Sequence, residues 1–108
     1  MIMVASYCRV STDKDDQANS FASQQRYFKE FIARQPDWEL FRVYADEGIT
    51  GTNTKKRVDF NRMINDAKMG KFKLILTKEV SRFSRNILDT IGYTRELKAL
   101  GIGVLFLN

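Results

Sequence analysis

The sequence predicts an α/β fold in three layers, with a mostly parallel central sheet and helices on both faces. Short apolar segments alternate with amphipathic segments along the 108 residues, and no internal repeat interrupts them. A content of 44% hydrophobic and 29% charged residues is ordinary for a globular protein. Strands that alternate with helices are joined by crossovers that cover both faces of a parallel sheet. We therefore expect a single domain over residues 1–108.

The first strand and the first helix are predicted from the start of the chain. Residues 1–10 are mostly apolar, and the alternation of side chains along a strand places Tyr7, Arg9 and Ser11 on one side. Ser20 is suited to be the N-cap of a helix that runs to about residue 34, and Pro36 marks its end. We expect this helix to bury one stripe, formed by Phe21, Gln25, Phe28 and Ile32.

The remaining elements continue the alternation, with strands predicted over residues 38–46, 72–77 and 102–107. A second helix is predicted over about residues 57–69, where Gly70 supplies the stop. Its apolar residues recur at i, i+3, i+4 and i+7 and are Phe60, Met63, Ile64 and Ala67. A third helix begins near residue 81 or 86 and ends at Gly101. Its expected apolar face consists of Ile87, Leu88, Ile91, Leu97 and Leu100.

Composition excludes several classes of function. The chain has no histidine, so serine-histidine chemistry is excluded, and Cys8 is the only cysteine, which excludes an internal disulfide and a multi-cysteine metal site. A net charge of +5 and a pI of about 9.5 favour a polyanionic partner. We expect no membrane segment and no signal peptide, and hence a cytoplasmic protein.

Three polar clusters fall where the predicted strands end, which is where ligands bind in an open parallel sheet. They comprise Tyr7, Arg9 and Ser11, then Asp46 and Glu47, then Lys78, Ser81, Arg82 and Arg85. Arg82 and Arg85 share one face of a helical turn, and they oppose the helix dipole unless an anion binds between them. The clusters predict an anion site. A merely polar strand end and a solvated arginine pair are the alternatives.

A hydroxyl-rich, glycine-containing loop is predicted between Asp46 and Arg57. It is not a P-loop, because no Gly-Lys-Ser/Thr follows at the required spacing. Lys55, Lys56 and Arg57 close the loop and suit contact with a phosphate backbone. An ordinary exposed loop is the alternative interpretation.

Together these motifs resemble the catalytic domain of the serine recombinases, the family of resolvases, invertases and large serine integrases. The resemblance spans essentially the whole chain. Tyr7-Cys8-Arg9-Val10-Ser11-Thr12 matches the nucleophile motif, and Ser20-Phe21-Ala22-Ser23-Gln24-Gln25 matches the start of the first helix. Asp46-Glu47-Gly48-Ile49-Thr50-Gly51 with Arg57, and Val80-Ser81-Arg82-Phe83-Ser84-Arg85-Asn86, match the other two motifs. Ser81 departs from the small resolvases, which usually carry aspartate there, and is more like the large integrases and related transposases.

The resemblance implies a mechanism and a set of residues for it. Ser11 would attack the scissile phosphodiester and form a 5′-phosphoserine link to DNA, which religation reverses, so that no cofactor, ATP or metal ion is needed. Guanidinium groups would hold the phosphate. The implied active-site residues are Ser11, Arg9, Arg82, Arg85, Asp46, Gln24 and Arg57. Asp46 is a candidate base and Gln24 a residue that orients a neighbour, while Lys55, Lys56 and Lys78 are candidate phosphate contacts.

The resemblance also implies partners and a larger protein. The partners are double-stranded DNA and further copies of the chain, in a dimer and a synaptic tetramer. We expect residues 1–108 to be a truncated N-terminal catalytic domain that lacks the DNA-binding region and is inactive alone. Two rival classes stay open. One is a non-enzymatic nucleic-acid-binding or dimerisation domain, and the other is a small-molecule phosphotransfer enzyme or phosphatase.

Overall fold

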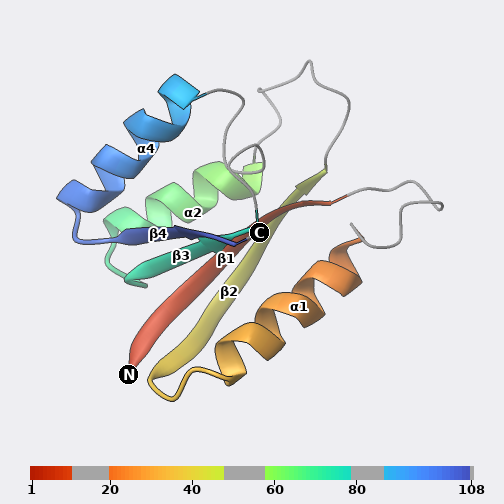
Figure 1. Ribbon diagram of the computed structural model, residues 1–108. Coiled ribbons are helices and arrows are strands. Elements are labelled where there is room, and N and C mark those ends of the chain that lie inside the picture. The colour runs from red at the N-terminus through yellow and green to blue at the C-terminus, as the bar shows by residue number, and fades with distance from the viewer. Residues whose placement is uncertain (11–19, 48–57, 79–86, 108) are drawn as a thin grey trace.

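The central sheet has four strands in the order β2-β1-β3-β4, and every neighbouring pair is parallel (Figure 1). The computed structural model describes residues 1–10, 20–47, 58–78 and 87–107. Its strands are β1 (Ile2–Val10), β2 (Trp38–Glu47), β3 (Leu74–Thr77) and β4 (Gly103–Phe106). Its helices are α1 (Phe21–Ala33), α2 (Val58–Lys68) and α4 (Ile87–Ala99). The predicted alternation of strands and helices is confirmed.

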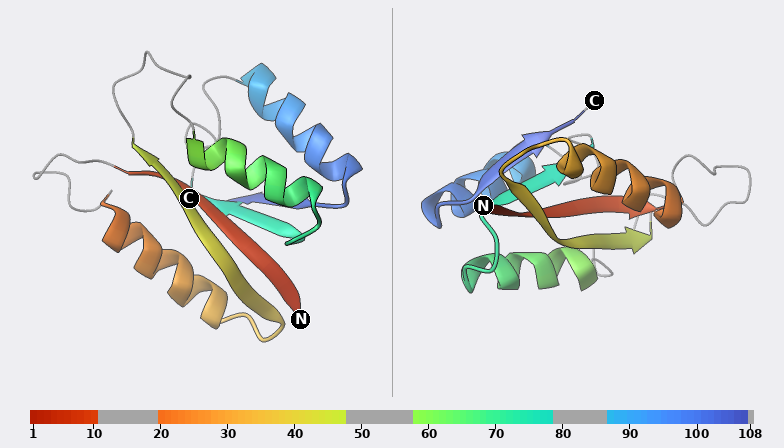
Figure 2. Two further views of the ribbon diagram at one scale, coloured as in Figure 1. Left: turned by 180° about the vertical axis from the view of Figure 1, so that it is seen from behind. Right: turned by 90° about the horizontal axis from the view of Figure 1, so that it is seen from below.

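Helices cover both faces of the sheet, as predicted (Figure 2). On one face α1 packs Phe28 and Ile32 against Val4, Cys8 and Leu76. On the other face α2 and α4 share a second apolar cluster, in which Phe60, Met63 and Leu97 meet Ala5, Tyr7 and Ile75. Because the strands bury side chains on both faces, the sheet forms the middle of three layers.

The buried face of α1 differs from the predicted stripe. Ser20 caps the helix as expected, because its Oγ accepts a hydrogen bond from the Ser23 amide at 3.2 Å. The buried residues are Gln24, Phe28 and Ile32, whereas Phe21 is 42% exposed. The prediction that Phe21 belongs to the buried stripe was wrong. The buried residues recur every four positions, and the first of them is a glutamine. A pattern of apolar residues cannot reveal a buried polar side chain.

The other helices follow their apolar pattern more closely. The buried residues of α2 are the four predicted ones, and Gly70 follows with a φ of 74°, a conformation that favours glycine. In α4 Leu97 is buried as expected, but Leu100 is 40% exposed. The helix ends at Ala99, so Leu100 follows it and is not part of its apolar face as predicted. The side chains of Ile87, Leu88 and Ile91 lie outside the described part of the chain.

A bulge in β2 determines which of its side chains reach the α2 face. Val4 pairs with Leu40, but Ala5 pairs with Arg42, so Phe41 is an extra residue in β2. Before the bulge Leu40 packs on the α1 side, and after it Val43 does so. Because of the extra residue, the alternation of side chains between the two faces reverses after the bulge, and Tyr44 and Asp46 face α2. Uninterrupted alternation from Leu40 through Phe41 would place both on the α1 side.

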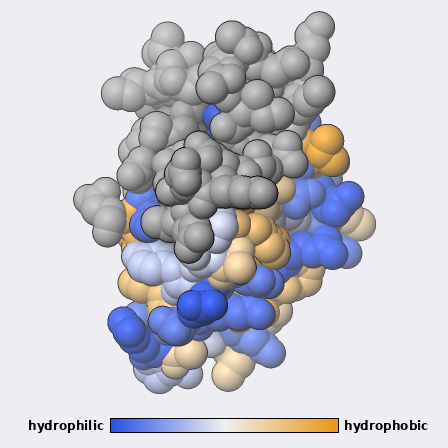
Figure 3. Space-filling view, turned by 90° about the vertical axis from the view of Figure 1, so that its right-hand side faces the viewer, coloured by the Kyte–Doolittle hydropathy of each residue, from blue (hydrophilic) through white to orange (hydrophobic). Residues whose placement is uncertain are grey.

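One face of the molecule has a surface of mixed hydropathy. In the view of Figure 3 hydrophilic residues surround smaller apolar patches. Among the described residues, no helix is both long and apolar enough to cross a membrane.

Candidate active site

The carboxyl ends of β1 and β3 mark the topological switch point of the sheet. The two strands are neighbours, yet the chain leaves β1 toward α1 on one face and leaves β3 toward α4 on the other (Figure 2). In folds of this kind, ligands bind at the carboxyl ends of the two strands that form the switch point. Two of the predicted polar clusters follow these two strands in the sequence.

Arg9 occupies the end of β1 at this point. Its Cα pairs with that of Asp46 in β2, and the alternation of β1 puts it on the same face as Tyr7. Among the described residues, the buried Arg9 Nε has no hydrogen-bond partner. The buried Thr77 hydroxyl, at the end of β3, has none there either. Buried polar atoms are nearly always satisfied in proteins, so this edge of the sheet is suited to a polar ligand.

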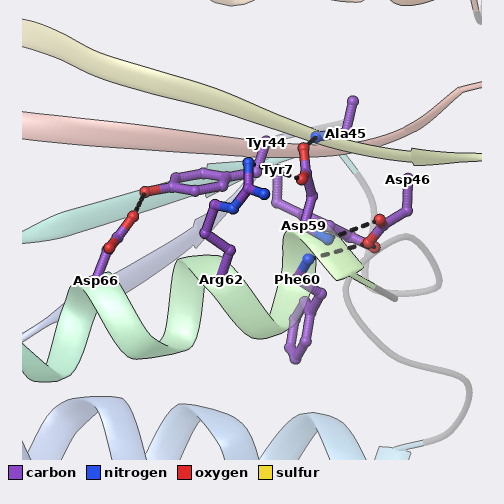
Figure 4. A network of polar contacts seen from close by, with 8 residues as sticks. All are labelled: Tyr7, Tyr44, Ala45, Asp46, Asp59, Phe60, Arg62 and Asp66. Atoms are coloured by element: carbon purple, nitrogen blue, oxygen red, sulfur yellow. Dashed lines mark hydrogen bonds and ion pairs between the residues drawn. The ribbon is translucent and has the colours of Figure 1, made fainter. Parts of the chain in front are cut away.

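Asp46 is 6% exposed and accepts three hydrogen bonds from described residues, two of which come from the first turn of α2 (Figure 4). Its Oδ1 accepts from the Asp59 amide at 2.9 Å. Its Oδ2 accepts from the Phe60 amide at 3.0 Å and from the Tyr7 hydroxyl at 2.9 Å. A carboxylate at a helix N-terminus satisfies otherwise unpaired amides and complements the helix dipole. Asp46 thus joins the ends of β1 and β2 to the start of α2.

Gln24 reaches the same strand end from the opposite face. Its side chain is 3% exposed, and its Nε2 donates a hydrogen bond of 2.9 Å to the carbonyl oxygen of Arg9. The bond fixes the backbone of β1 two residues before Ser11 in the sequence. Gln24 thus binds the backbone at Arg9, and its role in the reaction stays a prediction.

Lys78 lies on the α1 side of the sheet. Its Nζ is 5.0 Å from the centroid of the Tyr27 ring, which is the geometry of a cation–π contact. The structure therefore does not bring Lys78 beside Arg9, and its contact with phosphate stays a prediction. The other predicted residues lie outside the described part of the chain, namely Ser11, Lys55, Lys56, Arg57, Arg82 and Arg85.

Two residues of this network were not among the predicted active-site residues. Tyr7 is fully buried, with its ring 5.2 Å from that of Phe60 in an edge-to-face arrangement. Asp59 accepts a hydrogen bond of 3.0 Å from the backbone amide of Ala45. The sequence had already placed Tyr7 in the polar cluster with Arg9 and Ser11, on the same side of the first strand, but had given it no role in the reaction. For Asp59, the only sequence signal was its position as an acidic residue in the first turn of a helix.

The network offers carboxylates, but among the described residues no group of three or more Asp, Glu, Cys or His side chains is placed to hold a metal ion. The cation and the hydroxyl donor described at this edge are instead suited to hold an anion. They comprise the guanidinium of Arg9 and the hydroxyl of Thr77.

Cys8 lies beside this site with its thiol buried on the α1 side. Burial, reinforced by the negative charges of Asp46 and Asp59, raises the pKa of the Cys8 thiol to about 12 from an ordinary 9.0. Its Sγ lies 3.6 Å from the carbonyl oxygen of Tyr44. Burial and the hydrogen bond to Asp66 likewise raise the pKa of the Tyr44 phenol.

These shifts predict a loss of stability at alkaline pH. Between pH 9.0 and about 12 the unfolded chain releases the Cys8 proton while the folded chain keeps it, so the free energy of unfolding falls as pH rises through this window. Urea titrations at a series of pH values measure this slope, and Cys8→Ala should make it shallower. A thiol reagent should also leave the folded protein unmodified near neutral pH. Rapid modification of native protein would contradict the buried, neutral thiol.

Comparison with known proteins identifies the family. Residues 4–108 match the family model of the resolvase N-terminal domain. The chain belongs to this family. A resolvase-family site-specific recombinase from Streptococcus pneumoniae is 31% identical and has a TM-score of 0.80, over 99% of this chain and 72% of that one. The N-terminal catalytic domain of TP901-1 integrase is 27% identical with a TM-score of 0.79, over 98% of this chain and 78% of that one.

The resolvase-family chain is also similar to part of a longer curated protein. A candidate DNA recombinase of Bacillus subtilis (strain 168) is 29% identical over 106 residues. The match covers 98% of this chain but 20% of that protein, so the chain spans about a fifth of its length. The catalytic domain of ISC1926 TnpA, an IS607-like serine recombinase, is 15% identical with a TM-score of 0.80, over 98% of this chain and 69% of that one, and shows the shared fold.

Proposed function

We propose that this resolvase-family chain is the catalytic domain of a site-specific DNA recombinase that cuts DNA by covalent attack of Ser11. The observation that carries the proposal is the position of Arg9. Its buried Nε lacks a partner among the described residues, and it stands at the switch point two residues before Ser11 in the sequence. A guanidinium in that position is suited to hold a phosphate oxygen beside the serine.

The proposed cleavage step exchanges one phosphoester bond for another. The bond between Ser11 Oγ and phosphorus forms as the bond between phosphorus and the 3′ oxygen breaks, which leaves a 5′-phosphoserine and a free 3′-hydroxyl. The serine proton is released and the 3′ oxygen takes one up. Religation reverses both changes. The phosphoester energy is conserved in the covalent intermediate, so rejoining requires no nucleotide cofactor.

The charges of the site are suited to this step. Negative charge spreads over the phosphate oxygens in the transition state, where arginine side chains stabilise it. We assign that role to Arg9, with Arg82, Arg85 and Arg57 as further contributors. Both oxygens of Asp46 already accept hydrogen bonds, so we assign Asp46 to positioning and to charge balance beside Arg9. We therefore assign to the arginines the role of lowering the free energy needed to form the Ser11 alkoxide.

The same proposal covers the partners of the whole protein. Double-stranded DNA is the substrate, and the synapse is built from dimers that pair into a tetramer, with residues beyond this domain providing most of the DNA contacts. We expect residues 1–108 alone to bind DNA weakly and to perform no recombination. Lys55, Lys56 and Lys78 are proposed to contact phosphates during the reaction.

The test uses the full-length protein and a duplex selected for binding from a random pool, labelled at either the 5′ or the 3′ end of one strand. We expect the 3′-labelled piece to migrate with protein on a denaturing gel. The 5′-labelled piece should be free and extendable by a polymerase. Salt-dependent binding without any adduct would support the rival, a non-enzymatic nucleic-acid-binding domain. Turnover of a simple phosphate ester would support a phosphatase instead.

A further inference from the structure

Two aspartates join the end of β2 to the start of α2 through reciprocal hydrogen bonds (Figure 4). The backbone amide of Asp59 donates to Asp46 Oδ1 at 2.9 Å. In the other direction, the Asp59 side chain accepts from the backbone amide of Ala45, the residue before Asp46, at 3.0 Å. Each aspartate therefore binds the backbone at or next to the other, and we call this pair the Asp46–Asp59 clamp.

The clamp includes a backbone amide of the edge strand β2. Among the described strands, β2 is at the edge of the sheet, with β1 as its neighbour. The Ala45 amide donates to Asp59 Oδ2. The bond satisfies a polar group at the sheet edge and fixes where α2 begins relative to β2.

The electrostatic balance of the clamp also depends on α2. Two carboxylates in one network repel each other, and the Asp59 and Phe60 amides at the helix N-terminus offset that repulsion. The Arg62 guanidinium lies 3.6 Å from Asp59 Oδ1, but it is half exposed and screened by solvent. The hydrogen bond to Ala45 is therefore the contact of the Asp59 side chain that we expect to matter most.

The position of Asp46 depends on this arrangement. Two of its three hydrogen bonds come from the first turn of α2, and the third comes from the buried Tyr7 hydroxyl. If α2 shifts, the Asp46 carboxylate loses donors and moves relative to Arg9, whose Cα is its partner across the strands. A change at Asp59 is thus transmitted to the charge that stands beside the proposed phosphate-binding arginine.

We propose that Asp59 is a positioning residue for DNA cleavage, which acts by holding Asp46 in place beside Arg9. This inference rests on the proposed recombinase function. It assigns to Asp59 a hydrogen-bonding role rather than a charge role, since the contact with the Ala45 amide needs only an acceptor oxygen. Asparagine keeps such an oxygen, and alanine does not.

The test compares single-turnover cleavage by full-length Asp59→Ala and Asp59→Asn at saturating DNA. We expect Asp59→Ala to slow cleavage by about 10- to 100-fold, because small misplacements near reacting groups cost that much, and to leave DNA affinity within about twofold. Asp59→Asn should retain the rate within about threefold. A wild-type rate in Asp59→Ala, or an equal loss of rate in both variants, would overturn the proposal.

The matched control is Asp66→Ala, which removes another aspartate of α2 that binds β2. The Tyr44 hydroxyl donates to Asp66 Oδ2 at 2.6 Å, about two helical turns along α2 from Asp59. If Asp59 only stabilises the fold, the two alanine variants should affect cleavage alike. We expect Asp66→Ala to lower stability and to leave the cleavage rate unchanged.

A measurement that does not depend on activity separates failure of the clamp from failure of the proposed function. Amide hydrogen exchange at Ala45 should accelerate in Asp59→Ala and remain slow in Asp59→Asn. Unchanged exchange in Asp59→Ala would show that the clamp does not exist in solution. A wild-type protein that forms no DNA adduct, yet shows the expected exchange pattern, would instead refute the recombinase function and with it the catalytic role of Asp59.

Discussion

Ser11→Ala is expected to abolish the covalent protein–DNA adduct while site binding stays largely intact. The substitution removes the proposed nucleophilic oxygen and nothing that holds the duplex, so the loss should appear in chemistry and not in affinity. End-labelled duplex and a denaturing gel measure the adduct, and a mobility-shift titration measures binding. Thr12→Ala removes the neighbouring hydroxyl and should still form the adduct. An adduct that persists in Ser11→Ala and disappears in Thr12→Ala would identify a different nucleophile.

Arg9→Lys should slow cleavage by roughly 100- to 1,000-fold, the usual effect of removing a preorganised donor from a developing charge. An ammonium keeps the charge but cannot reproduce the planar, two-pronged contact of a guanidinium with phosphate oxygens. Arg9 Nε is buried and lacks a partner among the described residues, so lysine would also lose the donor that the site positions.

Single-turnover cleavage at saturating DNA measures the Arg9→Lys effect. Arg26→Lys makes the same exchange at an exposed position of α1 and controls for a general change in surface chemistry. It should leave the rate unchanged. A near-normal rate in Arg9→Lys would remove Arg9 from the proposed phosphate-binding role.

The sequence alone predicts the order of elements and much of the core, because local periodicity carries that information. The buried face of α2 was predicted in full from the spacing of Phe60, Met63, Ile64 and Ala67. The same reasoning failed for α1, where Gln24 is buried although it is polar. Its amide is satisfied by the Arg9 carbonyl, a contact between segments fifteen residues apart that no local pattern encodes.

The bulge in β2 shows a second limit. Phe41 is the inserted residue, and it is apolar like its neighbours. Both faces of β2 are covered, so an apolar side chain fits on either side and the alternation does not reveal the change of parity. The reversed alternation places Asp46 on the α2 side, and only the pairing of β1 with β2 in the structure reveals it.

Part of the candidate site could be predicted from the sequence motifs. The motifs identified Arg9, Gln24 and Asp46, and the structure brings these three to one end of β1. The partner of Asp59 is the backbone amide of Ala45, and a backbone group leaves no mark in the sequence. Positioning contacts of this kind can be recognised only in the three-dimensional structure.

The most direct test of the central claim is the mass of the tryptic peptide that carries DNA after cleavage. Trypsin cuts after Arg9 and Lys14, which separates Ser11, in the peptide of residues 10–14, from Tyr7 in the preceding peptide. After nuclease digestion of the trapped adduct, fragmentation should locate a 5′-linked nucleotide on Ser11. A nucleotide on Tyr7, or one linked through its 3′ end, would contradict the proposed mechanism.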